Sequence, residues 1–512
     1  LSVAACVILS GVSLTAGLGV DAQLADPIGL PRVGNDGGVL NAACVAGNIC
    51  LNNVTAGGAL TVGDPQAGNY PSALVLTGTS NVGDALLFAT DRITLGVAGQ
   101  SGGLTADNAI SMTALDGLLE APGTFNLTAP GGITLDIATN INGSPLSLGD
   151  PLNLGDVRVR AGGDVTLGDI DASALGGLSP SSAFSVNGAL SLGNVTVTGG
   201  AIAIDAGSIA ALSLITDGDI DLTSPGAITV ANDIAATNVD VTGASVSLNA
   251  TGALTVGTGT STTGSFAVQT VGDLNATNIS SADQAILTST GGAMTLDTVT
   301  APNLIRATAS DVLTVNDASA YDGAGGGQIE LTSVNSNLEL GTIFAGATIT
   351  GRASGSINAY SLSAGTIDMR ALGGDITAAF VSGGLVTLDA VGSLTVTDDL
   401  STPQFYGYAQ TGDIWIRSNS GFDVRDAAAS GNVTINSDGD VTIDSLAPAG
   451  GFIDISAYSM GLGTPGNGRS MEAGDSITLR TTGGSIATQD YSITAAGAVA
   501  ITSDDAITGG TL

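Results

Sequence analysis

A short pattern, G-[A/D/N/S]-[I/L/V]-x-[L/V/I], returns along the chain at intervals of about twenty residues. Copies and near matches begin at Gly252, Gly272, Gly292, Gly392, Gly412, Gly431 and Gly451. Each copy is a glycine followed by a short segment with apolar residues at alternate positions, which is typical of a strand with one buried face. One such strand cannot bury its apolar side alone, but stacked copies share a continuous core. The spacing therefore predicts an all-β solenoid with coils of about twenty residues.

The composition agrees with an elongated repetitive body rather than several compact globules. The 512 residues include 76 glycines, and aromatic residues make up only 3 % of the chain. A globule needs large side chains to fill its centre, whereas a coil of short strands needs only a thin column of Val, Ile, Leu and Ala. With 43 % hydrophobic residues, the chain is too apolar for a disordered protein. Glycine is too frequent for long helices.

Pairs of copies begin eight residues apart, at Gly218 and Gly226 and again at Gly431 and Gly439. We interpret each pair as two successive faces of one coil, with a corner at each glycine. Glycine suits a corner because it readily adopts a positive φ. Thr and Ser between the apolar positions are expected to point outward. Longer coils, such as the one containing 321–327, predict loops that bulge from one side.

The first 22 residues resemble part of a secretory signal peptide. An apolar run is followed by Val20 and Ala22, which occupy the −3 and −1 positions of a small-residue cleavage site before Gln23. The alternative is that this run forms a strand of the body. Signal cleavage predicts a secreted or cell-surface protein that is not inserted in a membrane afterwards.

Beyond the signal peptide we expect two further regions. Residues 23–130 have an irregular repeat and are predicted to cap the solenoid, and residues 131–512 form the repeat region, which we expect to continue beyond the sequence. Cys6 would leave with the signal peptide. The pair that remains, Cys44 and Cys50, predicts a small-loop disulfide that holds the cap.

The repeats resemble those of filamentous haemagglutinin-type exoproteins and related autotransporter passengers. The residues that carry this resemblance include 431–443, read as GNVTINSDGDVTI, and the stretch from Gly483 to Ile501. The resemblance covers most of residues 131–512. It implies a right-handed parallel β-helix and a bacterial surface adhesin or filament component. It also implies an outer-membrane transporter as an export partner.

Charge and missing residue types exclude several functions. The chain has 46 acidic and 11 basic residues, a formal net charge of −35, and no His. Such a surface repels phosphate backbones and anionic lipids, which argues against nucleic-acid and membrane-surface partners. It allows diffuse Ca²⁺ binding by carboxylates, but no dedicated cofactor is expected. The absence of His excludes imidazole-based catalysis and H-E-x-x-H zinc sites. Every basic residue is Arg, so the chain has no Lys and cannot form a P-loop.

An enzyme that acts on polysaccharides is the alternative function, because parallel β-helices include lyases and hydrolases. Two segments, 397–399 and 503–505, each place two Asp residues together, as a glycosidase or calcium site requires. We favour turn aspartates at coil corners. We therefore predict no enzymatic activity, no catalytic residues and no metal site.

The densest aromatic cluster predicts a recognition surface, with a local core as the alternative. Recognition surfaces in proteins are rich in Trp, Tyr and Arg. The predicted surface consists of Phe405, Tyr406, Tyr408, Trp415 and Arg417. We expect a structural or adhesive rod that presents Thr-, Ser- and Asp-rich faces. Its expected partners are glycans or proteins on host or other cells, or further copies of itself in filaments or a matrix.

Overall fold

The computed structural model describes thirteen segments of the chain, and these contain 51 strands and no helix. The segments are 7–9, 20–22, 48–52, 54, 59–62, 71–122, 124–129, 132–143, 146–148, 157–173, 182–463, 470–489 and 491–509. The fold is an all-β parallel β-solenoid of about 20 turns, with coils about 20 residues apart, as predicted. Its handedness stays a prediction. The chain divides into two compact units, Leu1–Thr262 and Thr263–Leu512.

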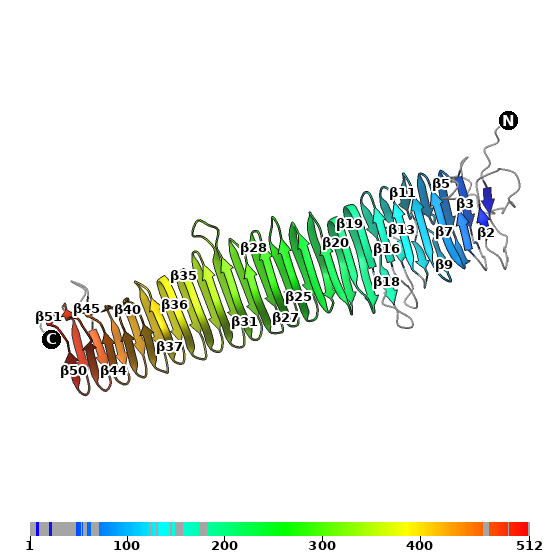
Figure 1. Cartoon of the computed structure of the whole chain (residues 1–512). Coiled ribbons are helices and arrows are strands. Elements are labelled where there is room, and N and C mark those ends of the chain that lie inside the picture. The colour runs from blue at the N-terminus through cyan, green and yellow to red at the C-terminus, as the bar shows by residue number, and fades with distance from the viewer. Residues whose placement is uncertain are drawn as a thin grey trace. The chain divides into compact units, whose positions relative to one another are not determined.

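The first part of unit 1 has three strands in each coil, and each strand pairs with its counterpart in the next coil (Figure 1). One ladder contains β2 (Val20–Ala22), β4 (Ala59–Val62), β7 (Asp84–Ala89), β10 (Ile110–Ala114), β13 (Ile133–Ile137) and β16 (Val157–Ala161). The second contains β1 (Val7–Leu9), β3 (Asn48–Asn52), β5 (Ala73–Thr77), β8 (Arg92–Leu95), β11 (Leu118–Glu120), β14 (Ile141–Gly143) and β17 (Val165–Leu167). The third contains β6 (Thr79–Val82), β9 (Ser101–Ala106), β12 (Thr124–Thr128), β15 (Leu146–Leu148) and β18 (Ile170–Ser173).

In the second part of unit 1 the faces merge into longer strands. The strand β19 (Ser182–Thr198) pairs with β16, β17 and β18, so one strand continues all three ladders. The remaining strands of the unit are β20 (Ile202–Thr216), β21 (Asp219–Thr223), β22 (Ala227–Ala235), β23 (Asn238–Gly243), β24 (Ser245–Ala250) and β25 (Leu254–Ser261). The predicted faces at Gly218 and Gly226 are confirmed, because β21 and β22 begin directly after these glycines.

Unit 2 begins with coils of two strands. One series is β26 (Phe266–Thr270), β28 (Gln284–Ser289), β30 (Leu304–Ala309), β32 (Gln328–Ser333), β34 (Thr348–Ala353), β38 (Phe405–Ala409) and β40 (Phe422–Ala429). The other is β27 (Leu274–Ser281), β29 (Met294–Thr300), β31 (Leu313–Ala320), β33 (Leu338–Ala345), β37 (Leu394–Ser401) and β39 (Ile414–Ser418). The long strands β35 (Ile357–Ala371) and β36 (Ile376–Ala390) belong to both series.

The last coils of unit 2 again have three strands. The first ladder contains β41 (Val433–Ser437), β44 (Ile453–Ala457), β47 (Ile477–Thr481) and β50 (Val499–Thr502). The second contains β42 (Val441–Ile443), β45 (Met460–Leu462), β48 (Ile486–Thr488) and β51 (Ile507–Gly509). The third contains β43 (Leu446–Ala449), β46 (Ser470–Ala473) and β49 (Ser492–Ala495).

The core consists of apolar side chains stacked in register through successive coils. Ile414, Val433, Ile453 and Ile477 are in-register partners, and each is at most 1 % exposed. The intervening residue of such a strand, for example Thr434, points outward. The alternation in the sequence therefore places one column of small apolar side chains inside each face and a polar row outside it.

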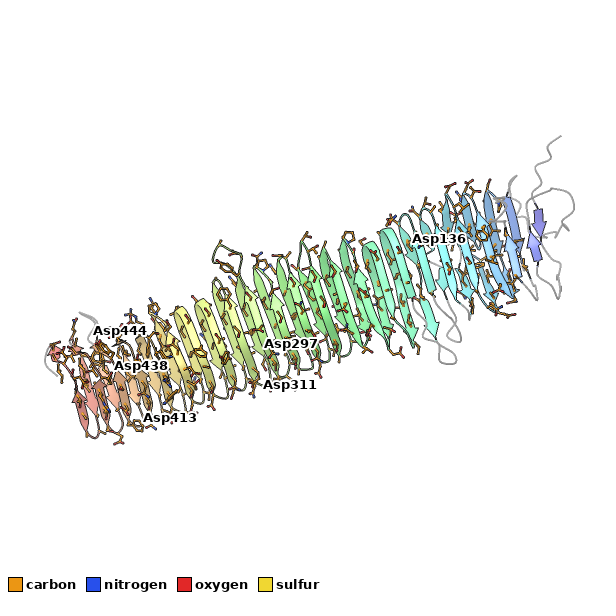
Figure 2. All side chains as sticks on the ribbon, viewed as in Figure 1. Asp136, Asp297, Asp311, Asp413, Asp438 and Asp444 are labelled. Carbon is orange, nitrogen blue, oxygen red and sulfur yellow. The ribbon has the colours of Figure 1, made fainter. Side chains whose placement is uncertain are left out.

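One corner of unit 2 carries a chain of hydrogen bonds that joins consecutive coils. At each step a polar side chain accepts the backbone N–H of the residue that follows the glycine in the next coil. Asp375 Oδ1 accepts from Ser393 at 2.7 Å, and Asp413 Oδ1 accepts from Asn432 at 2.6 Å. Asp413 and another corner residue, Asp311, are labelled along the same edge of the unit in Figure 2. The side chains of this corner ladder are Asn337, Ser356, Asp375, Ser393, Asp413 and Asn432.

The corner ladder explains the glycine at six coil corners of unit 2 and corrects the expectation of a positive φ at these corners. None of the glycines beside these side chains has a positive φ. Instead, a Cβ on each would collide with the side-chain oxygen of the preceding coil. The glycines are Gly355, Gly374, Gly392, Gly412, Gly431 and Gly451. Positive φ occurs elsewhere, as in the loop of Tyr321–Gly327, where Gly323, Gly325 and Gly327 have φ of 84°, 92° and 93°.

The described N-terminal segments are also strands in register. Within 1–22, β1 pairs with β3 and β2 pairs with β4. The strands from β5 to β12 follow the same three ladders as those after residue 131, so pairing in this part of the predicted cap is regular. Cys6 and Cys44 lie outside the described residues, as does the side chain of Cys50 in β3. The signal peptide, the domain limits and the disulfide stay predictions.

Candidate functional site

The residues of the predicted recognition surface lie on β38 and β39, and one of them is in the core. Phe405 is fully buried. Its ring packs edge-to-face against Phe422, with a centroid distance of 6.4 Å and an interplanar angle of 86°. Phe405 therefore stabilises the coil interior, which is the alternative that the sequence left open.

The other four side chains point outward from two different faces. Tyr406 and Tyr408 lie on β38, in the ladder that continues into β40. Trp415 and Arg417 lie on β39, in the ladder that continues into β41. The corner of 410–413 separates the two strands. The structure does not bring the predicted residues together into one surface, because residues close in sequence are divided by this corner.

Tyr408 is held by a carboxylate of the next coil. Its hydroxyl donates to Asp426 Oδ2 at 3.0 Å. Burial first, and then the negative charge of Asp426, raise the pKa of Tyr408 from 10.0 to about 12. Tyr408 therefore stays a neutral hydrogen-bond donor over the physiological range.

A partly buried cluster of charges is centred on Arg425 of the neighbouring strand β40. Arg425 Nη1 lies 2.7 Å from Asp444 Oδ2, and Nη2 lies 3.2 Å from Asp423 Oδ2. The Asp444 side chain, labelled in Figure 2, is only 4 % exposed, and within the described residues its Oδ1 has no hydrogen-bond partner. The hydrogen bond to Asp444 is the largest effect on the pKa of Arg425 and raises it, whereas burial acts in the opposite direction. The pair joins two coils and is structural in character.

Four other aromatic side chains of unit 2 are exposed and form two ring pairs that the sequence analysis did not assemble. Tyr321 is 49 % exposed, Phe344 40 %, Tyr360 60 % and Phe380 38 %. We call these four residues the aromatic ledge. Exposed apolar clusters of this kind mark interaction sites more often than isolated exposed residues do.

The aromatic ledge extends over successive coils of one series of paired strands. Tyr321 directly follows β31, Phe344 lies on β33, and Tyr360 and Phe380 lie in the first halves of β35 and β36. The rings of Tyr321 and Phe344 are 5.8 Å apart and tilted by 55°. Those of Tyr360 and Phe380 are 5.5 Å apart and nearly perpendicular, at 75°. Each ring is thus supported by another, on strands fixed by parallel pairing.

Hydroxyls and carboxylates surround the rings. One outward row contains Asp317, Thr342, Ser361, Phe380 and Asp399 as consecutive in-register partners. Two Asp residues therefore lie in this row, with hydroxyls and a ring between them. This arrangement offers apolar contact area together with hydrogen-bond donors and negative charge.

The sequence does contain a signal for the ledge. The buried neighbours Ile343 and Val381 fix the alternation, so Phe344 and Phe380 must point outward. Phe380 lies two coils after Phe344 and two residues before Ser382, which is in register with Phe344, so both rings fall on the same series of strands. Density along the sequence favours the cluster around Phe405 instead, and coil-by-coil spacing would have been the better criterion.

The paired aspartates considered for catalysis take part in coil-to-coil hydrogen bonds. Asp399 Oδ1 accepts the Asn419 N–H at 2.8 Å and the Ser418 hydroxyl at 3.3 Å. Asp505 Oδ2 accepts the Ser485 hydroxyl at 2.9 Å. In the described part of the chain, no group of three or more Cys, Asp or Glu side chains could hold a metal ion.

A hollow of about 480 Å³ lies on the outer side of unit 1. Small side chains such as Ala183 line it, together with Asp136, Arg160, Asp205 and Asp221. Asp136, labelled in Figure 2, is the in-register neighbour of Arg160. The hollow has the size of a small-ligand site, with an apolar lining and a few charged groups.

No protein-family model, curated protein or solved structure matches the chain significantly. Among the described residues, no helix has the length and apolarity needed to cross a membrane. The candidate sites therefore rest on the geometry of this chain alone.

Proposed function

We propose that the protein is a secreted or cell-surface adhesive and structural protein of the filamentous haemagglutinin type, built as a right-handed β-helix and exposed on a bacterial surface. The observation that supports this proposal is the aromatic ledge. Its rings are between 38 and 60 % exposed, on the outward side of strands, or directly after a strand, whose inward side chains are buried. Exposing them costs solvation free energy that a binding partner would recover.

The scaffold suits adhesion because its surface is fixed before binding. Parallel pairing and the corner ladder hold each coil against the next, so little conformational entropy is lost when a partner docks. The partners that we propose are glycans or proteins on host or other cells, or further copies of the protein in filaments. An outer-membrane transporter is the proposed export partner.

Adhesion can be tested with protein-coated beads and a panel of epithelial and bacterial cells. The ledge variant is Tyr360→Ser with Phe380→Ser. The control variant is Phe452→Ser with Tyr458→Ser, because these rings are 38 and 50 % exposed in the same unit but outside the ledge. We expect wild-type and control beads to adhere and ledge-variant beads to lose most of their adhesion.

Two results would contradict this proposal. Wild-type beads that adhere no better than albumin-coated beads would argue against an adhesive function, and equal adhesion by all three proteins would remove the ledge as its basis. Sedimentation velocity over a range of protein concentrations would separately test self-association, which predicts species larger than the monomer.

A polysaccharide lyase or hydrolase is the second candidate, and the hollow of unit 1 favours it. Its carboxylates and Arg160 could contact a sugar, and carboxylates are the catalytic groups of most glycosidases. Incubation with acidic and neutral glycans, with and without Ca²⁺, would test this function. Product release that is abolished by Asp205→Asn would support an enzyme and contradict the adhesive proposal.

A further inference from the structure

The charges around the aromatic ledge all have one sign. Asp317 and Asp399 lie in the outward row that contains Phe380, and Asp322 directly follows Tyr321. The described strand segments that carry the rings or directly precede one, 313–320, 338–345, 357–364 and 376–383, contain no Arg. The only other charged side chain on them is Glu339. The ledge is therefore an aromatic surface in a purely acidic setting.

Asp322 is held in place by its own loop. Its Oδ1 accepts the N–H groups of Ala324 and Gly326, each at 2.8 Å. These two hydrogen bonds lower the pKa of the carboxyl below 3.8. A fixed negative charge thus stands next to the pair of rings formed by Tyr321 and Phe344.

We propose that the ledge binds a basic, Lys- and Arg-rich segment of a partner protein. This inference rests on the proposed adhesive function and specifies its ligand. An ammonium or guanidinium group over the face of a Tyr or Phe ring is attracted by the negative face of the ring. The neighbouring carboxylates attract the same cations, and the net charge of −35 accelerates their approach.

A basic segment uses every feature of the ledge, whereas other ligands do not. A neutral glycan would stack on the rings and could donate hydroxyl hydrogen bonds to the flanking carboxylates, but it would gain nothing from their negative charge. An anionic glycan would be repelled by them and by the chain as a whole. Ring pairs that meet at 55° and 75° also form angled walls rather than the single flat platform that suits a sugar ring.

The test uses the full chain and a labelled twelve-residue peptide of alternating Arg and Gly, with binding followed by fluorescence anisotropy in 50 mM and 300 mM NaCl. We expect the ledge variant to bind at least tenfold more weakly than wild type, and the control variant to bind within twofold of it. The three proteins have the same net charge, so non-specific attraction is equal in all of them. Equal urea midpoints would show that each variant is folded.

A second pair of substitutions tests the carboxylates. Asp317→Asn with Asp399→Asn keeps the hydrogen-bond acceptor that Asn419 needs but removes two charges. We expect affinity to fall about fivefold in 50 mM NaCl and to change much less in 300 mM NaCl, because salt screens the lost attraction.

Two outcomes would overturn the inference. Peptide binding that is equal in the wild-type, ledge and control proteins would show that net charge alone attracts it. Peptide binding that fails in wild type, while bead adhesion still depends on the ledge, would leave the adhesive function intact and exclude a basic ligand. A ledge occupied instead by a neutral oligosaccharide, such as maltohexaose or cellohexaose, would give this second result.

Discussion

Substitution of Gly431 by alanine should destabilise the coil that contains it, through a clash with a side chain of the preceding coil. A Cβ at residue 431 would overlap Asp413 Oδ1 and would lie 3.0 Å from the Gly412 carbonyl oxygen. To make room, Asp413 must rotate away and give up the 2.6 Å hydrogen bond from the Asn432 N–H. The change thus removes one step of the corner ladder without touching a core residue.

The expected cost follows from these contacts. A hydrogen bond to a charged acceptor contributes about 1.5–3 kcal/mol, and solvent exposure of Asp413 favours the lower end. With the tight carbonyl contact added, Gly431→Ala should cost about 2 kcal/mol. Asp413→Ala alone should cost about 1–1.5 kcal/mol. The double variant should cost little more than Asp413→Ala, which corresponds to a coupling energy of about 1–2 kcal/mol.

Hydrogen exchange of the β39 and β41 amides, supported by urea unfolding, would measure these energies locally. Gly252→Ala is the control, because no atom lies within 4 Å of its added Cβ and its φ is not positive. It should change stability by less than about 0.5 kcal/mol or stabilise slightly. If Gly431→Ala costs as much in the Asp413→Ala background as in the wild-type chain, the clash is not the reason for glycine at this corner.

Three further predictions concern ionisable groups. Spectrophotometric titration should give Tyr408 a pKa of about 12, and Asp426→Asn should return it only part of the way to 10.0, because burial is the larger cause. Because folding raises the pKa of Tyr408, the stabilisation from its neutral hydroxyl is complete below pH 10.0 and is lost as the pH rises towards 12. Tyr408→Phe should abolish this pH dependence of stability. NMR titration should give the carboxyl of Asp322 a pKa below 3.8. Its stabilisation of the loop is therefore complete above pH 3.8 and is lost as the pH falls through the folded pKa. A pKa of 3.8 or more would contradict the two amide hydrogen bonds. Arg425→Met should cost roughly 2–3 kcal/mol in urea unfolding, because it leaves Asp444 buried without its partner, and Arg425→Met with Asp444→Leu should recover most of this loss. A double variant no more stable than Arg425→Met alone would argue against that reason.

The local features of the fold could be predicted from the sequence. The alternation in Val433, Thr434 and Ile435 correctly indicates which side chains are buried, because a strand has only two faces. Glycine also marks the corners correctly. Its physical reason could not be predicted, since the oxygen that excludes a Cβ at Gly431 comes from Asp413 in another coil.

The candidate site was less predictable because it depends on which residues of different coils lie side by side. Tyr406 and Trp415 are close in sequence, but a corner separates their faces. Phe344 and Phe380 are far apart in sequence, but lie in the same series of coils. Coil lengths vary, for example where the loop of 321–327 lengthens one coil, so a fixed period loses the register.

The corner ladder also limits the order in which coils can be arranged. Its members stack about 4.8 Å apart, and two carboxylates at about that separation repel by roughly 1 kcal/mol even in water. The two acidic steps, Asp375 and Asp413, are separated by the neutral Ser393. Tandem duplication of the coil with Asp413 would place like charges on adjacent steps. The order of acidic and neutral coils along this corner therefore contributes to stability, and a duplication of the Asp413 coil would carry this electrostatic cost.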